Sequence, residues 1–119
     1  MVSPMNVNND SILETTKQLL GIGQVFTEFD REITVHINTV FSNLAQMGIG
    51  PETGFVITGP ETLWSSFIGD TLLTQQFKSY VYLKVRIIFD PPANGNLLDA
   101  LNKTASELEY RLYTHSGGY

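Results

Sequence analysis

Few side chains in this chain could do chemistry, and none of them falls into a common catalytic arrangement. The two histidines, His36 and His115, lie far apart in the sequence, and no cysteine, second histidine or carboxylate pair at metal-ligand spacing accompanies His36. No serine sits in a nucleophile elbow, and no motif surrounds either histidine. We therefore expect no enzyme activity, no metal and no cofactor.

Two further features could be mistaken for functional motifs. The tripeptide GIG occurs at 21–23 and again at 48–50, which could indicate a phosphate-binding loop. Both copies follow predicted helices instead of joining a strand to a helix N-terminus, so helix C-caps are the better interpretation. Asp90 precedes two prolines, and a turn role is favoured there over a catalytic acid.

The composition is that of one globular domain. The chain has 119 residues, 42% of them hydrophobic, and it has no cysteine, which excludes disulfides and fits a reducing cytoplasm. No run approaches the ~20 apolar residues that span a membrane. The formal charge of −5, with no basic cluster, argues against a surface made for binding nucleic acid. We expect a soluble intracellular protein that does not associate with membranes.

Helical periodicity dominates the regions that must form the core. Ser11 and Glu14 have capping-box spacing and predict a first helix that ends at the glycines of 21–23. A second helix begins near 27–30 and has an apolar stripe, from Phe29 to Met47, at three- and four-residue spacing. A last helix is predicted over 96–113.

The run SYVYLKVRIIFDPP at 79–92 allows two interpretations. Its apolar residues alternate as in a half-buried strand, but no glycine or proline separates it from the helical pattern that begins near Asp70. A strand this long would be unusual. We therefore predict one largely buried central helix, which the prolines after Asp90 bring to an end.

The middle of the chain, 51–69, differs from the rest because it is rich in glycine and aromatic residues. We predict an aromatic arm there, with a short strand over 55–58 and a brief helical turn over 63–67. The fold class is thus all-α, a compact bundle of about four helices with one short β-arm. Residues 1–10 are predicted to be a flexible N-terminal arm, 11–113 a single helical domain, and 114–119 a flexible C-terminal tail.

Aromatic side chains are the best candidates for binding a partner. A domain of this size has several of them near its surface, and exposed aromatics are favoured in protein interfaces. For Phe77 and Tyr80 core packing is favoured, for Trp64 core and interface roles are evenly balanced, and for Tyr113 and Tyr119 an interface role is favoured.

The order of segments resembles a known family. The segments ILETTKQLLGI, FDREITVHINTVFSNLAQMGIGPE, TLWSSFI, YVYLKVRIIFDPP and LLDALNKTASELEYRL resemble the small head-tail connector, neck or adaptor proteins of long-tailed bacteriophages. The resemblance implies a virion structural protein that forms a ring, usually dodecameric, beneath the portal protein. Such a ring extends the channel through which double-stranded DNA passes without specific binding, and it receives the next neck or tail component. It implies assembly in the host cytoplasm and a place in the neck of the mature virion.

The resemblance also suggests two sets of contact residues. The C-terminal helix and tail of such proteins dock against the portal, which by position corresponds here to Tyr110, Leu112, Tyr113, His115 and Tyr119. The aromatic arm would contact the neighbouring copy in the ring through Phe55, Ile57, Leu63, Trp64 and Phe67. An alternative function stays open, a small helical protein-binding module or antitoxin-like regulator that sequesters one partner through the arm.

Overall fold

The computed structural model describes residues 10–69 and 71–115, and these residues form five helices and no sheet. The helices are α1 (Ile12–Leu20), α2 (Asp30–Gln46), α3 (Trp64–Phe67), α4 (Thr71–Phe89) and α5 (Gly95–His115). The predicted all-α fold is confirmed. Most of the predicted N-terminal arm and C-terminal tail, 1–9 and 116–119, lies outside the described residues.

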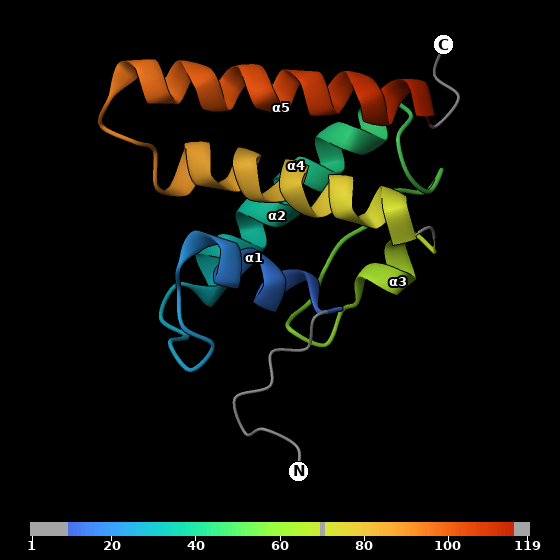
Figure 1. The fold of residues 1–119 in the computed structure, drawn as a ribbon. Coiled ribbons are helices and arrows are strands. Elements are labelled where there is room, and N and C mark those ends of the chain that lie inside the picture. Colours follow the sequence, from blue (N-terminus) through green and yellow to red (C-terminus); the bar gives the residue numbers. More distant parts are fainter. Residues whose placement is uncertain (1–9, 70, 116–119) are drawn as a thin grey trace.

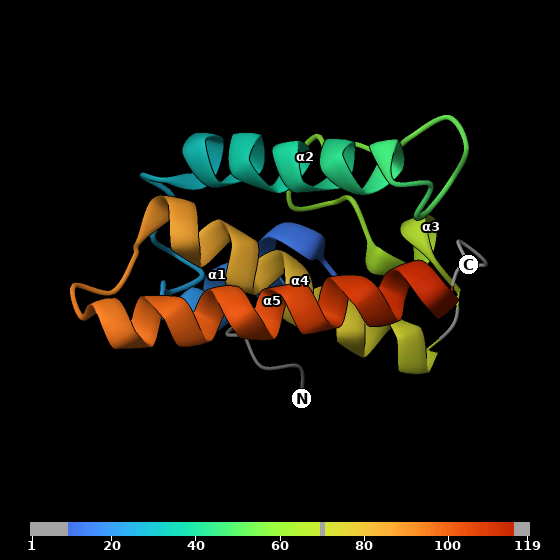
Figure 2. The ribbon, with the colours of Figure 1, turned by 90° about the horizontal axis from the view of Figure 1, so that it is seen from above.

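Helix α4 is the centre of the bundle. In Figure 1 it runs antiparallel to α5, and in Figure 2 it lies between α2 on one side and α5 on the other. Helix α1 also packs against it. The segment from Ser79 to Phe89 is helical throughout, as the continuous pattern predicts. Val81 and Val85 are fully buried. Helix α4 has apolar residues on several of its faces because three other helices cover it.

The ends of α1 follow the predicted signals. The Ser11 side chain accepts a hydrogen bond from the Glu14 N–H at 3.1 Å, which caps the first turn. Gly21 has a φ of 84° and ends the helix in the left-handed conformation that a residue with a Cβ avoids. The C-cap interpretation of the first GIG is therefore confirmed.

Helix α5 is slightly longer than predicted at both ends. It begins at Gly95 because the Asn94 side chain accepts hydrogen bonds from the N–H groups of Asn96 and Leu97, at 2.8 and 3.1 Å. It continues through His115, two residues beyond the predicted end. The first two residues of the predicted tail thus belong to the helix.

The aromatic residues of the middle segment pack inward around Phe67. The ring centroid of Phe67 lies 4.7 Å from that of Phe41 on α2, 4.8 Å from Phe77 on α4 and 5.1 Å from Phe55. Pairs at such distances add to the stability gained by burial. The middle segment therefore forms part of the hydrophobic core of its own subunit.

The strand expected over 55–58 is not confirmed, since the only β-bridge among the described residues joins Ser11 and Leu63. The Asn38 side chain instead accepts a hydrogen bond from the Ile57 N–H at 2.7 Å and donates one to the Ile57 carbonyl at 3.0 Å. This amide supplies the two bonds that a neighbouring strand would otherwise supply. The segment 55–58 therefore pairs with a side chain of helix α2 and not with another strand.

The entry to α1 is bound to the segment around the start of α3. The Ile12 N–H donates to the Thr62 carbonyl at 3.1 Å, and the Trp64 N–H donates to the Asp10 carbonyl at 2.6 Å. The Ser65 hydroxyl donates to the Asp10 carboxylate at 2.6 Å, across 55 positions of sequence. The start of the described chain is thereby fixed to its middle.

Candidate functional site

The described residues contain no arrangement typical of a metal site. Among them no three His, Cys, Asp or Glu residues lie close enough together to hold a metal ion. His36 is half-buried on α2, with its Nε2 3.5 Å from a Glu32 carboxylate oxygen, and His115 is exposed at the end of α5. None of the helices in the described ranges combines the length and hydrophobicity of a membrane span. The surfaces of the bundle are therefore the candidate functional features.

The residues predicted to contact a neighbouring copy lie mostly in the core. Ile57, Trp64 and Phe67 are buried, with Trp64 fully inaccessible, whereas Phe55 and Leu63 are partly buried. The structure thus gives these side chains a packing role within the subunit. A lateral contact through this set stays a prediction.

The middle segment does present one apolar side chain to solvent. Val56 is 64% exposed between the inward-facing Phe55 and Ile57. It lies next to α2, where Val35 is 56% exposed. Val56 lines a hollow with Asn38, and Val35 lines a second hollow with Thr58, so both valines lie on the side of α2 against which the middle segment packs. We call this surface the α2 face.

The predicted portal-binding residues divide by exposure. Tyr110 is 69% exposed, Tyr113 is 40% exposed and His115 is exposed, all on the C-terminal part of α5. Leu112 is 1% exposed and belongs to the core. Tyr119 lies outside the described residues. The end of α5 therefore brings two tyrosines and a histidine to the surface.

A groove between α1, α4 and α5 was not predicted. Its volume is about 390 Å³, and its lining includes Leu19, Tyr82, Leu83, Leu108, Glu107 and Arg111. Leu19, near the C-terminal end of α1, is 49% exposed. Exposed apolar surface in a hollow is typical of an interaction site. We call this hollow the α4/α5 groove.

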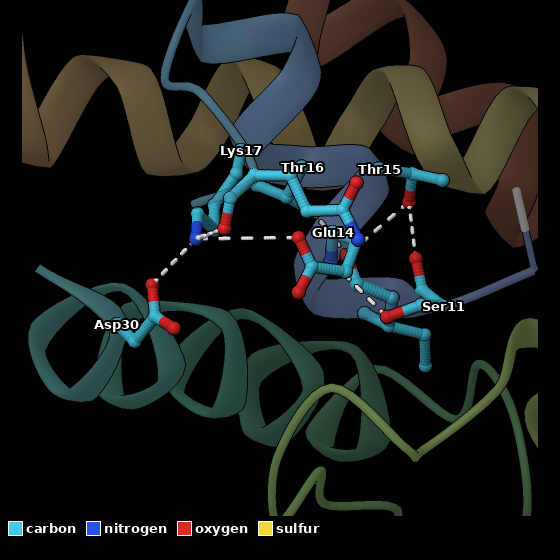
Figure 3. Close-up of polar contacts among 8 residues, drawn as sticks. Ser11, Glu14, Thr15, Thr16, Lys17 and Asp30 are labelled. Atoms are coloured by element: carbon cyan, nitrogen blue, oxygen red, sulfur yellow. Dashed lines mark hydrogen bonds and ion pairs between the residues drawn. The ribbon is translucent and has the colours of Figure 1, made fainter. Parts of the chain in front are cut away.

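A buried lysine is the second feature that the sequence pattern did not reveal. Lys17 on α1 is 0% exposed, and its Nζ lies 2.8 Å from an Asp30 carboxylate oxygen at the start of α2 (Figure 3). The same Nζ donates to the Gln24 carbonyl at 3.3 Å and lies 4.0 Å from Glu14. This cation therefore connects both helices and the loop between them. The spacing of Lys17 four residues after Leu13 was the available signal.

A hydrogen bond connects the two longest helices. The Tyr80 hydroxyl, in the buried part of α4, donates to Glu109 on α5 at 2.7 Å. Burial of the phenol, together with the neighbouring Glu109 carboxylate, raises the pKa of Tyr80 well above its usual range. The core role favoured for Tyr80 is confirmed, because the residue is 1% exposed.

We expect Tyr80→Phe to lower the free energy of unfolding by about 1 kcal/mol at neutral pH. The folded chain holds the Tyr80 proton more tightly than the unfolded chain does, so this stabilisation is present below pH 10 and declines as the pH rises above it. The difference between wild type and variant in urea denaturation should therefore shrink above pH 10. A difference independent of pH would contradict the assignment, and Tyr110→Phe, which removes an exposed hydroxyl, is the control.

Comparison with known proteins supplies one assignment. Neither the curated proteins nor the solved structures give a match to the chain. The family described as phage connector protein matches residues 12–118, which is nearly the whole sequence and includes all five helices. The resemblance found in the order of sequence segments is thereby confirmed, and the chain belongs to the phage connector protein family.

Proposed function

We propose that this head-tail connector protein assembles as a ring, dodecameric by analogy with similar connectors, beneath the portal protein of the filled head. The ring extends the DNA channel and receives the next neck or tail component. Subunits assemble in the host cytoplasm and remain in the virion neck. The observation that carries the proposal is the family match over residues 12–118.

The C-terminal part of α5 is the proposed portal-docking element. Tyr110, Tyr113 and His115 are exposed there, and tyrosines on a surface give a large contact area with a polar group at the end. Leu112 contributes by holding this part of α5 against the core, since it is fully buried. The proposed docking element also includes Tyr119, which lies outside the described residues.

The charge of the chain suits a conduit for DNA. A ring of subunits that each carry a formal charge of −5 repels the phosphate backbone, so the duplex passes without being held. Binding by counterion release needs a basic surface, which the composition does not supply. The proposed contact with DNA is therefore passage and not recognition.

The proposed function can be tested by electron microscopy of the chain mixed with the portal protein from the same genome. We expect an added ring of density on one face of the portal. Deletion of residues 113–119 should abolish the added ring, because it removes Tyr113, His115 and Tyr119, while the helical content measured by circular dichroism changes little. Tyr110→Ser should also weaken attachment to the portal, without lowering the melting temperature of the chain.

Leu97→Ser is a matched control at the other end of α5, because it also removes a partly exposed apolar side chain. This variant should attach normally. A portal without added density would contradict the connector ring, and a soluble one-to-one complex with another protein would favour the binding-module function. Normal attachment of the deletion variant would exclude the end of α5 as the docking element.

A further inference from the structure

We propose that the α2 face of one copy packs into the α4/α5 groove of the next copy, so that each copy offers one surface and accepts the other. This inference rests on the proposed ring and names the two surfaces that would build it. The α2 face is the surface around Val35 and Val56, and the groove lies between α1, α4 and α5.

The two surfaces lie on different sides of the subunit. Figure 2 shows α2 on one side of α4 and α5 on the other. A contact between two different surfaces is heterologous, and repeated rotation by a constant angle closes it into a ring. A contact between two copies of the same surface would instead stop at a dimer. The placement of the α2 face and the groove is therefore compatible with a ring.

Each surface has exposed apolar groups at its centre. On the α2 face these are Val35, at 56% exposed, and Val56, at 64%. In the groove they include Leu19, at 49%, and the partly buried Tyr82 and Leu108. The groove volume of about 390 Å³ gives room for side chains from a neighbour. Burying these groups against one another would remove apolar surface from water, which favours association.

The balance of charge differs between the two surfaces. The exposed ionisable side chains of residues 28–61 are four glutamates and one arginine, namely Glu28, Arg31, Glu32, Glu52 and Glu61. Helix α4 carries Lys78, Lys84 and Arg86 and has no acidic residue. Arg86 is four residues from Tyr82, and its Nη1 donates to the Tyr82 hydroxyl at 3.2 Å, whereas Lys78 lines a different hollow beside Asp10. The groove lining itself has one acid, Glu107, and one base, Arg111. With Arg86 at its edge, the groove side is therefore less acidic than the α2 side.

Arg111 strengthens this complementarity. It lines the groove, is exposed, and forms no ion pair with any residue that the structure describes. A carboxylate from the α2 face of a neighbour could accept from its guanidinium in two places. Pairing two α2 faces would instead bring glutamates against glutamates, which is unfavourable. A second copy of this chain, placed head to tail, is thus the occupant that the charges favour.

The absence of cysteine allows a direct test by cross-linking. Val56→Cys marks the α2 face, and Thr104→Cys marks the groove side of α5, next to the lining residues Leu108 and Glu107. In assemblies on the portal, the double variant Val56→Cys/Thr104→Cys should give a ladder of covalent multimers with a short bismaleimide. Each single variant should stay monomeric. Val56 lies beside α2, Thr104 lies on α5, and α4 lies between these two helices, so the two cysteines of one subunit should not react with each other.

Three comparisons make the result decisive. Val56→Cys/Ser106→Cys places the second cysteine elsewhere on the exposed surface of α5 and should give no ladder. Arg111→Glu, added to the double variant, should lower the yield of the ladder several-fold, and high ionic strength should act in the same direction. Dimers from either single variant would overturn the head-to-tail contact. Added ring density without a ladder would overturn only these two surfaces, whereas the absence of ring density with the wild-type chain would overturn the proposed function.

Discussion

Trp64→Ala should lower the free energy of unfolding by about 4 kcal/mol. The Trp64 side chain is fully inaccessible, and its ring centroid lies 6.1 Å from that of Phe41 and 6.4 Å from that of Phe67. Its Nε1 also donates a hydrogen bond to the Thr15 hydroxyl at 2.9 Å, which links α3 to α1. The alanine variant loses both the packing and this bond. Urea denaturation followed by circular dichroism measures the change.

Trp64→Phe is the matched variant, because it keeps an aromatic ring but removes the N–H donor. It should cost clearly less than the alanine substitution. The comparison also separates a core role from a lateral contact. An alanine variant of normal stability that fails to form rings would show that Trp64 acts at the surface of the assembled protein, in contradiction to its burial in the subunit.

Lys17→Met should destabilise the subunit by about 3 kcal/mol, because it leaves two carboxylates beside a buried site without their cation. Asp30 lies 2.8 Å from the lysine Nζ and its side chain is 25% exposed, so water compensates for only part of the loss. The bond from Nζ to the Gln24 carbonyl is also lost. Chemical denaturation measures the stability of the variant.

Lys103→Met is the control for removing a lysine, since Lys103 is exposed on α5 and its loss should change stability by less than about 0.5 kcal/mol. Adding Asp30→Asn to Lys17→Met should recover part of the lost stability, because it removes one of the unpaired charges. Equal effects of Lys17→Met and Lys103→Met would show that the buried ion pair contributes nothing specific.

The helices could be predicted because their signals are local. The capping pair at Ser11 and Glu14, the apolar stripe of α2, and the uninterrupted pattern of α4 each depend on residues within a few turns. Helix α5 begins one residue before its predicted start, because the Asn94 side chain caps its first turn. The spacing of residues within each segment was therefore sufficient to predict the helices.

Tertiary features could not be predicted in the same way. Residues 55–58 have the alternating pattern of a strand, but the partner that pairs with Ile57 is a side chain, Asn38, 19 positions earlier. The burial of Lys17 depends on Asp30, whose place is set by the loop between α1 and α2. The α4/α5 groove takes residues from three helices. Spacing within one segment contains no information on such contacts.

The hydrogen bonds between the entry to α1 and the region of Thr62 to Ser65 have a consequence for the order of folding. During synthesis α1 leaves the ribosome long before these partners and α4 are made. A helix of nine residues is too short to be stable alone in water. We therefore expect α1 to form late, when the centre of the chain has emerged, and the subunit to fold and unfold as one cooperative unit.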